Sequence, residues 1–127
     1  MRSRPWSEIV EFYRDLTEQH GWDMQPMVRL TETIATSRYA TGVYPATSLA
    51  TLFMAQHPEF EKDQNTLQVD FEEGRFIFVY SESPSFSDGT PRTTPTLSTP
   101  WNKECGRDAA FRTFEHVMRR LKWFVNL

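Results

Sequence analysis

The sequence LQVDFEEGRFIFVY, residues 67–80, predicts a β-hairpin and sets the fold class of this chain of 127 residues. Apolar and polar residues alternate in its first half, which is the period of a strand with one buried face. An acidic residue followed by glycine, Glu73 and Gly74, then marks a tight turn between two β-rich runs. The returning run is apolar at every position after Arg75, so we expect this strand to be central in a sheet or covered on both faces.

The segment before the hairpin, residues 27–56, predicts two or three further strands. Pro26 is expected to break any helix, and Val28, Leu30 and Ile34 alternate with polar residues. Eight Thr or Ser residues between positions 31 and 51 favour extended chain, since hydroxyl-rich, β-branched composition suits strands. The last of these strands would contain residues 49–54, although a helix over residues 47–56 is an alternative.

Amphipathic helices are predicted at both ends of the chain. Ser3 and Pro5 suit a helix start, and an apolar arc from Trp6 to Leu16 is followed by Gly21, which favours a helix end. A second apolar arc predicts a helix over residues 107–122. The expected fold is therefore α+β: a single domain over residues 1–127, with an antiparallel sheet of four to five strands flanked by N-terminal and C-terminal helices.

A long Pro-, Ser- and Thr-rich segment, residues 83–102, separates the hairpin from the last helix. Its four prolines, at positions 84, 91, 95 and 100, disfavour both a helix and a central strand. Connections of this length in a compact domain are usually either disordered or functional. We expect the segment to be a loop that Trp101 fixes to the core.

Composition excludes several classes of protein. With 14 Lys and Arg against 17 Asp and Glu, the net charge of -3 disfavours binding to nucleic acid. One cysteine excludes an internal disulfide framework, and the three histidines are too scattered to predict a metal site. No signal peptide and no apolar run of about 20 residues is present, so we expect a cytoplasmic protein with no membrane association. No cofactor-binding motif predicts a cofactor.

Two residues are weak candidates for catalysis. If residues 28–34 form a strand, Glu32 shares a face with Leu30 and Ile34, where a desolvated carboxylate could act as a general acid or base. A structural carboxylate paired with a base, or a bulge that turns it outward, is the alternative reading. Cys105 lies just before the predicted last helix, where free N–H groups favour a thiolate, and a buried inert thiol is its alternative.

Three residues on the last helix are candidates for binding a partner. At 100° per residue, Arg112, Arg119 and Trp123 fall on the charged side of the helix, away from its apolar arc. Trp123 follows Arg119 by four residues, the spacing of side chains in contact, and exposed Trp beside Arg is typical of interaction hot spots. In the alternative reading the helix ends earlier and Trp123 folds back into the core.

The sequence predicts a small, non-enzymatic protein-binding module, either with another protein as partner or as a homodimer. No phosphate-binding loop, metalloprotease motif or nucleophile elbow is present, whereas ten Phe and four Trp exceed the needs of a minimal core. In outline the element order is similar to that of secretion-chaperone-like folds and small immunity proteins. The alternative is a small enzyme or ligand-binding protein with a pocket between the Thr-rich sheet and the 83–102 loop.

Overall fold

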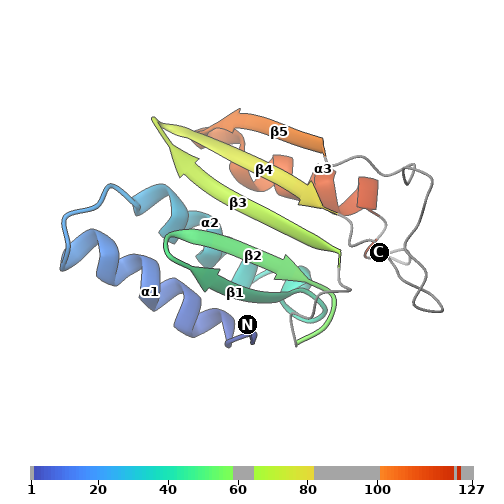
Figure 1. Ribbon diagram of the computed structural model, residues 1–127, viewed down its shortest axis with the longest axis horizontal. Coiled ribbons are helices and arrows are strands. Elements are labelled where there is room, and N and C mark those ends of the chain that lie inside the picture. Colours follow the sequence, from blue (N-terminus) through green and yellow to red (C-terminus); the bar gives the residue numbers. More distant parts are fainter. Residues whose placement is uncertain (1, 59–64, 82–100, 122, 124–127) are drawn as a thin grey trace, which may run out of the picture.

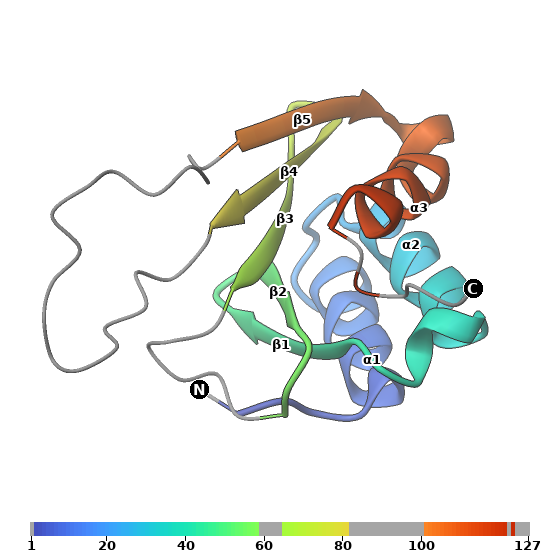
Figure 2. The same cartoon turned by 90° about the vertical axis from the view of Figure 1, so that its right-hand side faces the viewer.

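The computed structural model describes residues 2–58, 65–81, 101–121 and 123, without the side chain of Trp101. These residues form two layers, a five-stranded antiparallel sheet and three α-helices, and the helices all lie on one face of the sheet (Figures 1 and 2). The predicted α+β fold, with helices at both ends of the chain and an antiparallel sheet between them, is confirmed.

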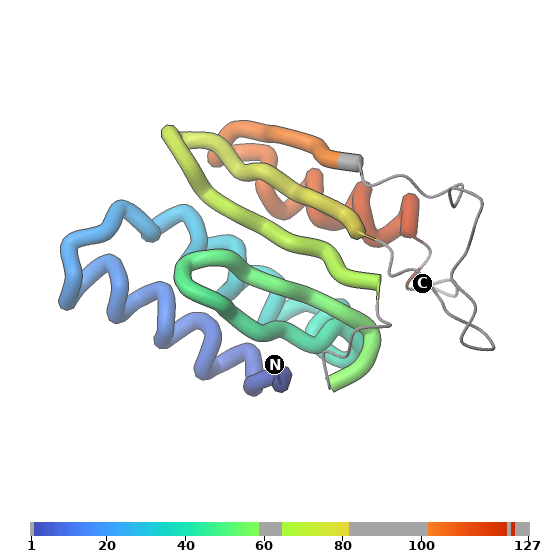
Figure 3. The backbone as a smooth tube through the Cα atoms, in the orientation of Figure 1, coloured from blue at the N-terminus to red at the C-terminus, as the bar shows by residue number. Residues whose placement is uncertain are grey.

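The sheet is a meander in which every strand pairs with its neighbour in sequence, as the backbone tube in Figure 3 shows. Its strands, in order, are β1 (Tyr44–Ser48), β2 (Thr51–Ala55), β3 (Thr66–Glu72), β4 (Arg75–Ser81) and β5 (Trp101–Gly106). Such a topology needs only short-range connections between most strands, which the hairpin signals in the sequence supply.

The predicted hairpin of residues 67–80 is confirmed as β3 and β4. Glu72 pairs with Arg75, and the two residues between them, Glu73 and Gly74, have φ angles of 51° and 78°. Positive φ at both loop residues is the requirement of a type I′ turn, whose twist matches that of the flanking strands. The Glu-Gly pair therefore fixes the register of the whole hairpin.

Strand β4 lies inside the sheet, paired with β3 on one side and β5 on the other. Phe76, Phe78 and Tyr80 are buried toward the helices, whereas Ile77 and Val79 lie half-buried on the opposite face. The expectation that this apolar strand is central is thus confirmed by its two paired neighbours.

The prediction of a strand over residues 28–34 is wrong, because these residues belong to helix α2 (Gln25–Ala35). Met27, Leu30, Thr31 and Ile34 are all buried, and this spacing of three and four residues is the face of a helix. Pro26 is compatible with the helix because it lies in the first turn, where its missing N–H has no helical partner.

The threonines of α2 also fit the helix. The hydroxyl of Thr31 donates to the carbonyl of Met27 at 2.8 Å, and that of Thr33 donates to the carbonyl of Arg29 at 2.7 Å. These bonds to the preceding turn satisfy the hydroxyls without solvent. The composition of residues 27–56 is therefore compatible with a helix as well as with strands, because threonine hydroxyls can bond to carbonyls one turn earlier.

The two predicted terminal helices are confirmed. Helix α1 (Trp6–Glu18) buries Trp6, Ile9, Val10 and Tyr13. A short 3₁₀ helix η3 (Arg107–Ala109) leads into α3 (Ala110–Leu121). A 3₁₀ helix, η1 (Arg38–Ala40), connects α2 to the sheet. None of the helices in the described part of the chain is both long and apolar enough to cross a membrane.

Two other expectations are wrong, one about the end of the long loop and one about the end of the Thr-rich segment. Residues 101 and 102 are the first two residues of β5 rather than the end of a loop, and residues 83–100 lie outside the described residues. The alternative helix over residues 47–56 is wrong, since β1 and β2 pair there as a hairpin.

Candidate functional site

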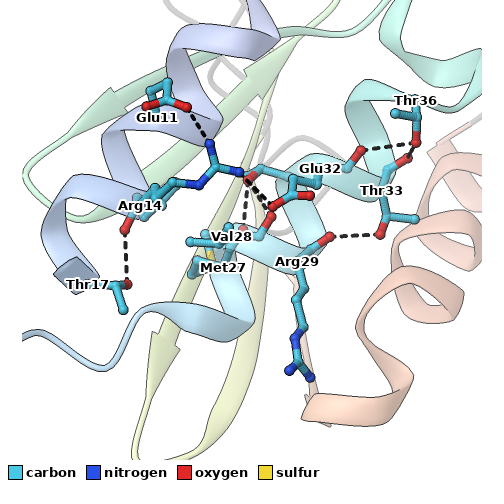
Figure 4. Close-up of polar contacts among 11 residues, drawn as sticks. Glu11, Arg14, Thr17, Met27, Val28, Arg29, Glu32, Thr33 and Thr36 are labelled. Atoms are coloured by element: carbon cyan, nitrogen blue, oxygen red, sulfur yellow. Dashed lines mark hydrogen bonds and ion pairs between the residues drawn. The ribbon is translucent and has the colours of Figure 1, made fainter.

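Glu32 lies on α2 and forms an ion pair with Arg14 of α1, as Figure 4 shows. The distance from the guanidinium to the carboxylate is 3.1 Å, and the Glu32 side chain is 50% exposed. The expectation that Glu32 points to an apolar face is wrong, because in a helix it lies opposite the buried positions Leu30 and Ile34. The structure corresponds to the alternative of a paired structural carboxylate.

The charges around Arg14 join the two helices. Arg14 also forms an ion pair with Glu11 one turn earlier in α1. The charge of Glu11, and to a smaller degree the bond to Glu32, raises the pKa of the Arg14 guanidinium. Arg14 is therefore a permanent cation between two carboxylates at the surface. This arrangement stabilises the three charges and does not transfer a proton.

Cys105 lies within β5 and not at the start of the last helix. It faces Phe76 across the strand pair, and its side chain is only 8% exposed. A thiol in this position packs as a small apolar side chain against the core. The N-cap of η3 is Gly106, so Cys105 lies before the cap and inside the sheet.

The three predicted partner-binding residues do not form one exposed surface. Arg112 and Arg119 are exposed on α3, as expected. Trp123 is half-buried and packs against the hydrophobic core beyond the end of the helix at Leu121. This placement corresponds to the alternative in which the helix ends before Trp123.

A surface that the sequence analysis did not single out is the face of the sheet opposite the helices, which no described helix covers (Figure 2). The strand register places Phe53, Gln68 and Val79 in one row across this face, and Asp70 and Ile77 in the row beside it. We call this surface the open sheet face; its central residues are Phe53, Gln68, Asp70, Ile77 and Val79. In the sequence this surface is indicated by β4, because the apolar residues of that strand occupy both faces of the sheet.

The open sheet face carries apolar and polar side chains at its centre and acidic side chains at its rim. Phe53, Ile77 and Val79 are half-buried, although polar residues are usual on the solvated face of an antiparallel sheet. Asp70 accepts a hydrogen bond from the hydroxyl of Thr51. At the rim, Glu72 and Glu104 face a single base, Arg75, which pairs with Glu104 at 3.5 Å.

The two edges of the sheet are less suited to binding. At β1 the N–H of Arg4 donates to the carbonyl of Pro45 at 3.0 Å, so the N-terminal segment covers part of this edge. At β5, Lys103 shares the helix-facing side with Phe78, its partner in β4, yet it is exposed. Proline and inward-pointing charge are both devices that prevent a further strand from pairing with an edge.

A pocket of about 410 Å³ lies between α2 and the start of α3. Arg29, Leu30 and Thr33 of α2 line one wall, and Arg107, Asp108 and Phe111 line the other. No sequence pattern indicates this pocket, because its walls come from distant segments and one wall is predicted as a strand. The predicted pocket between the Thr-rich sheet and the 83–102 loop involves residues 83–100, which lie outside the described residues.

No three His, Cys, Asp or Glu side chains among the described residues are close enough to hold a metal ion. Comparison with known proteins gives no family for the chain: no protein-family model, no curated protein and no solved structure matches it.

Proposed function

We propose that this protein is a non-enzymatic protein-binding module that binds a partner polypeptide on the open sheet face. The observation that carries the proposal is a group of three half-buried apolar side chains, Phe53, Ile77 and Val79, on a face that no described helix covers. Exposed apolar clusters rimmed by polar groups are typical of protein interaction sites.

The charge of this face indicates the chemistry of the partner. Asp70 lies beside Ile77, Glu72 and Glu104 lie at the rim, and among the described residues of this face Arg75 is the base that pairs with Glu104. A partner that presents apolar side chains flanked by lysine or arginine would match this arrangement, whereas an acidic partner would be repelled. We therefore propose a partner segment in which apolar and basic residues alternate.

The proposal is tested by titrating the isotope-labelled full chain with a synthetic twelve-residue peptide that alternates valine and lysine. We expect chemical-shift changes at Phe53, Gln68 and Val79. A matched peptide with glutamate in place of lysine should leave these signals unchanged. Changes confined to α3, or equal effects of the two peptides, would contradict the proposal.

Two variants sharpen the test. Val79→Lys places a positive charge in the centre of the open sheet face and should weaken binding of the lysine-containing peptide at least about tenfold. Leu49→Lys is the matched control, because Leu49 is 91% exposed but lies at the turn between β1 and β2. Equal affinities for the two variants would count against the open sheet face. A dimer of the free protein that Val79→Lys dissociates would replace the basic partner with a second copy of the chain.

A further inference from the structure

The pocket between α2 and the start of α3 has the size and shape of a small-molecule site. Its volume of about 410 Å³ lies near the lower end of the roughly 300–1,000 Å³ that is usual for such sites. The floor is apolar: Leu30 and Ala110 are both buried, and Phe111 is half-buried beside them. A ligand of the size of an amino acid, and not an extended cofactor, matches this space.

Aromatic contacts hold the apolar wall in place. The ring of Phe111 stacks on that of Phe114 with 5.9 Å between centroids, and it meets the ring of Tyr39 edge-on at 6.2 Å. Phe114 and Tyr39 are themselves buried in the core. The wall is therefore formed before any ligand arrives, which lowers the entropic cost of binding.

Two of the four charged side chains at the pocket neutralise each other. Arg107 pairs with Asp23 at 3.4 Å, and its guanidinium lies 5.5 Å from the centre of the Phe71 ring. These contacts fix Arg107 at the rim and compensate its charge.

The other two charged side chains, Arg29 on α2 and Asp108 on η3, lie on opposite walls. In the part of the chain that the structure describes, neither side chain makes a hydrogen bond or an ion pair. In Figure 4 the side chain of Arg29 extends from α2 away from Glu32 and its ion pair. The pocket thus offers one uncompensated cation and one uncompensated anion above an apolar floor.

We infer that this pocket binds a small zwitterion with an apolar body, the chemistry of a free amino acid with an aromatic or branched side chain. The guanidinium of Arg29 would bind the carboxylate, for which its planar pair of donors is suited. The carboxylate of Asp108 would accept hydrogen bonds from the ammonium group, and the side chain would lie on Leu30 and Phe111. This inference does not depend on the open sheet face.

Four probes separate the parts of the inference. L-phenylalanine contains the carboxylate, the ammonium group and the apolar body. Its analogues 3-phenylpropionate, phenethylamine and glycine each lack one of these. We expect saturable binding of L-phenylalanine to the full chain by calorimetry, and binding at least about tenfold weaker for each analogue. Equal binding of 3-phenylpropionate and L-phenylalanine would contradict a role for Asp108.

Variants then place the binding in the pocket. Arg29→Gln and Asp108→Asn should each weaken the binding of L-phenylalanine at least about tenfold, because each removes one charge partner. Arg112→Gln is the matched control, since Arg112 is exposed on α3 but does not line the pocket. No saturable binding up to the solubility limit of L-phenylalanine, or unchanged binding by Arg29→Gln, would overturn the inference.

Discussion

Tyr13 couples the stability of the fold to alkaline pH. Its side chain is fully buried on α1, and its hydroxyl donates to the carbonyl of Ala50 at 3.0 Å. Burial raises the pKa of Tyr13 far above its ordinary value of 10.0, and the negative charge of Asp70 raises it further, whereas Arg4 opposes the shift. Above pH 10 the unfolded chain therefore loses this proton while the folded protein keeps it, so the free energy of unfolding falls as pH rises.

The variant Tyr13→Phe tests this coupling. We expect the wild-type protein to lose up to about 1.4 kcal/mol of unfolding free energy per pH unit above 10 from this group, and the variant to lack that part of the slope. At neutral pH the variant should be about 1 kcal/mol less stable, because the carbonyl of Ala50 loses its donor. Urea unfolding between pH 7 and 11 measures both effects, with Tyr44→Phe, at an exposed site, as the control.

Glu32 should contribute little to stability, because its ion pair with Arg14 is at the surface and Arg14 keeps Glu11 as a partner. We expect the urea midpoint of Glu32→Gln to stay close to that of the wild type. Ile34→Ala, two residues away and fully buried, should by contrast lose about 2–5 kcal/mol of unfolding free energy. A similar loss of unfolding free energy in Glu32→Gln would indicate that the Glu32 carboxylate is buried. That is the position it would have in the predicted strand over residues 28–34.

At the scale of elements, the turn between β1 and β2 is strained. Ser48 pairs with Thr51, and Leu49, the first of the two loop residues, has a φ of 56° and is 91% exposed. Glycine adopts this conformation without the cost that a side chain brings. We expect Leu49→Gly to raise the unfolding free energy by up to about 1 kcal/mol and Ala50→Gly, at a residue without positive φ, to lower it. Thermal unfolding of the two variants shows whether each change raises or lowers the unfolding free energy.

The end of α3 depends on Trp123. Because this side chain is half-buried against the core, Trp123→Ala should lose roughly half of the about 3–5 kcal/mol that is typical of a fully buried aromatic. Arg119→Ala, at an exposed position of the same helix, should leave stability nearly unchanged. A normal urea midpoint for Trp123→Ala, with loss of binding to a partner, would restore the interpretation of Trp123 as an interaction hot spot.

At the scale of the whole molecule, the sheet edges disfavour pairing between copies. Lys103 places an exposed ammonium group on the helix-facing side of β5, and Pro45 with the N-terminal segment covers part of β1. We expect a monomer by light scattering. Lys103→Val should promote association through β5, whereas Lys103→Arg, which keeps the charge, should not. A wild-type dimer that both variants leave unchanged would contradict this role of the edge.

Local patterns in the sequence were sufficient to predict the central hairpin and the two terminal helices. The hairpin of β3 and β4 follows from period-two alternation and from a Glu-Gly turn that adopts positive φ at both residues. Helices α1 and α3 follow from long apolar arcs, which have many positions and therefore a clear period. Together these elements determined the α+β class before any tertiary contact was known.

The packing of helices against the sheet, and no local signal, makes residues 25–35 a helix and thereby forms the pocket between α2 and α3. Val28 and Leu30 fit either period over so short a segment, and the helix is preferred because Met27, Leu30, Thr31 and Ile34 become buried together. The ion pair of Glu32 with Arg14, the walls of the α2/α3 pocket and the rows of the open sheet face all join residues distant in sequence. No local period encodes such contacts, since they exist only when helices and strands pack against one another.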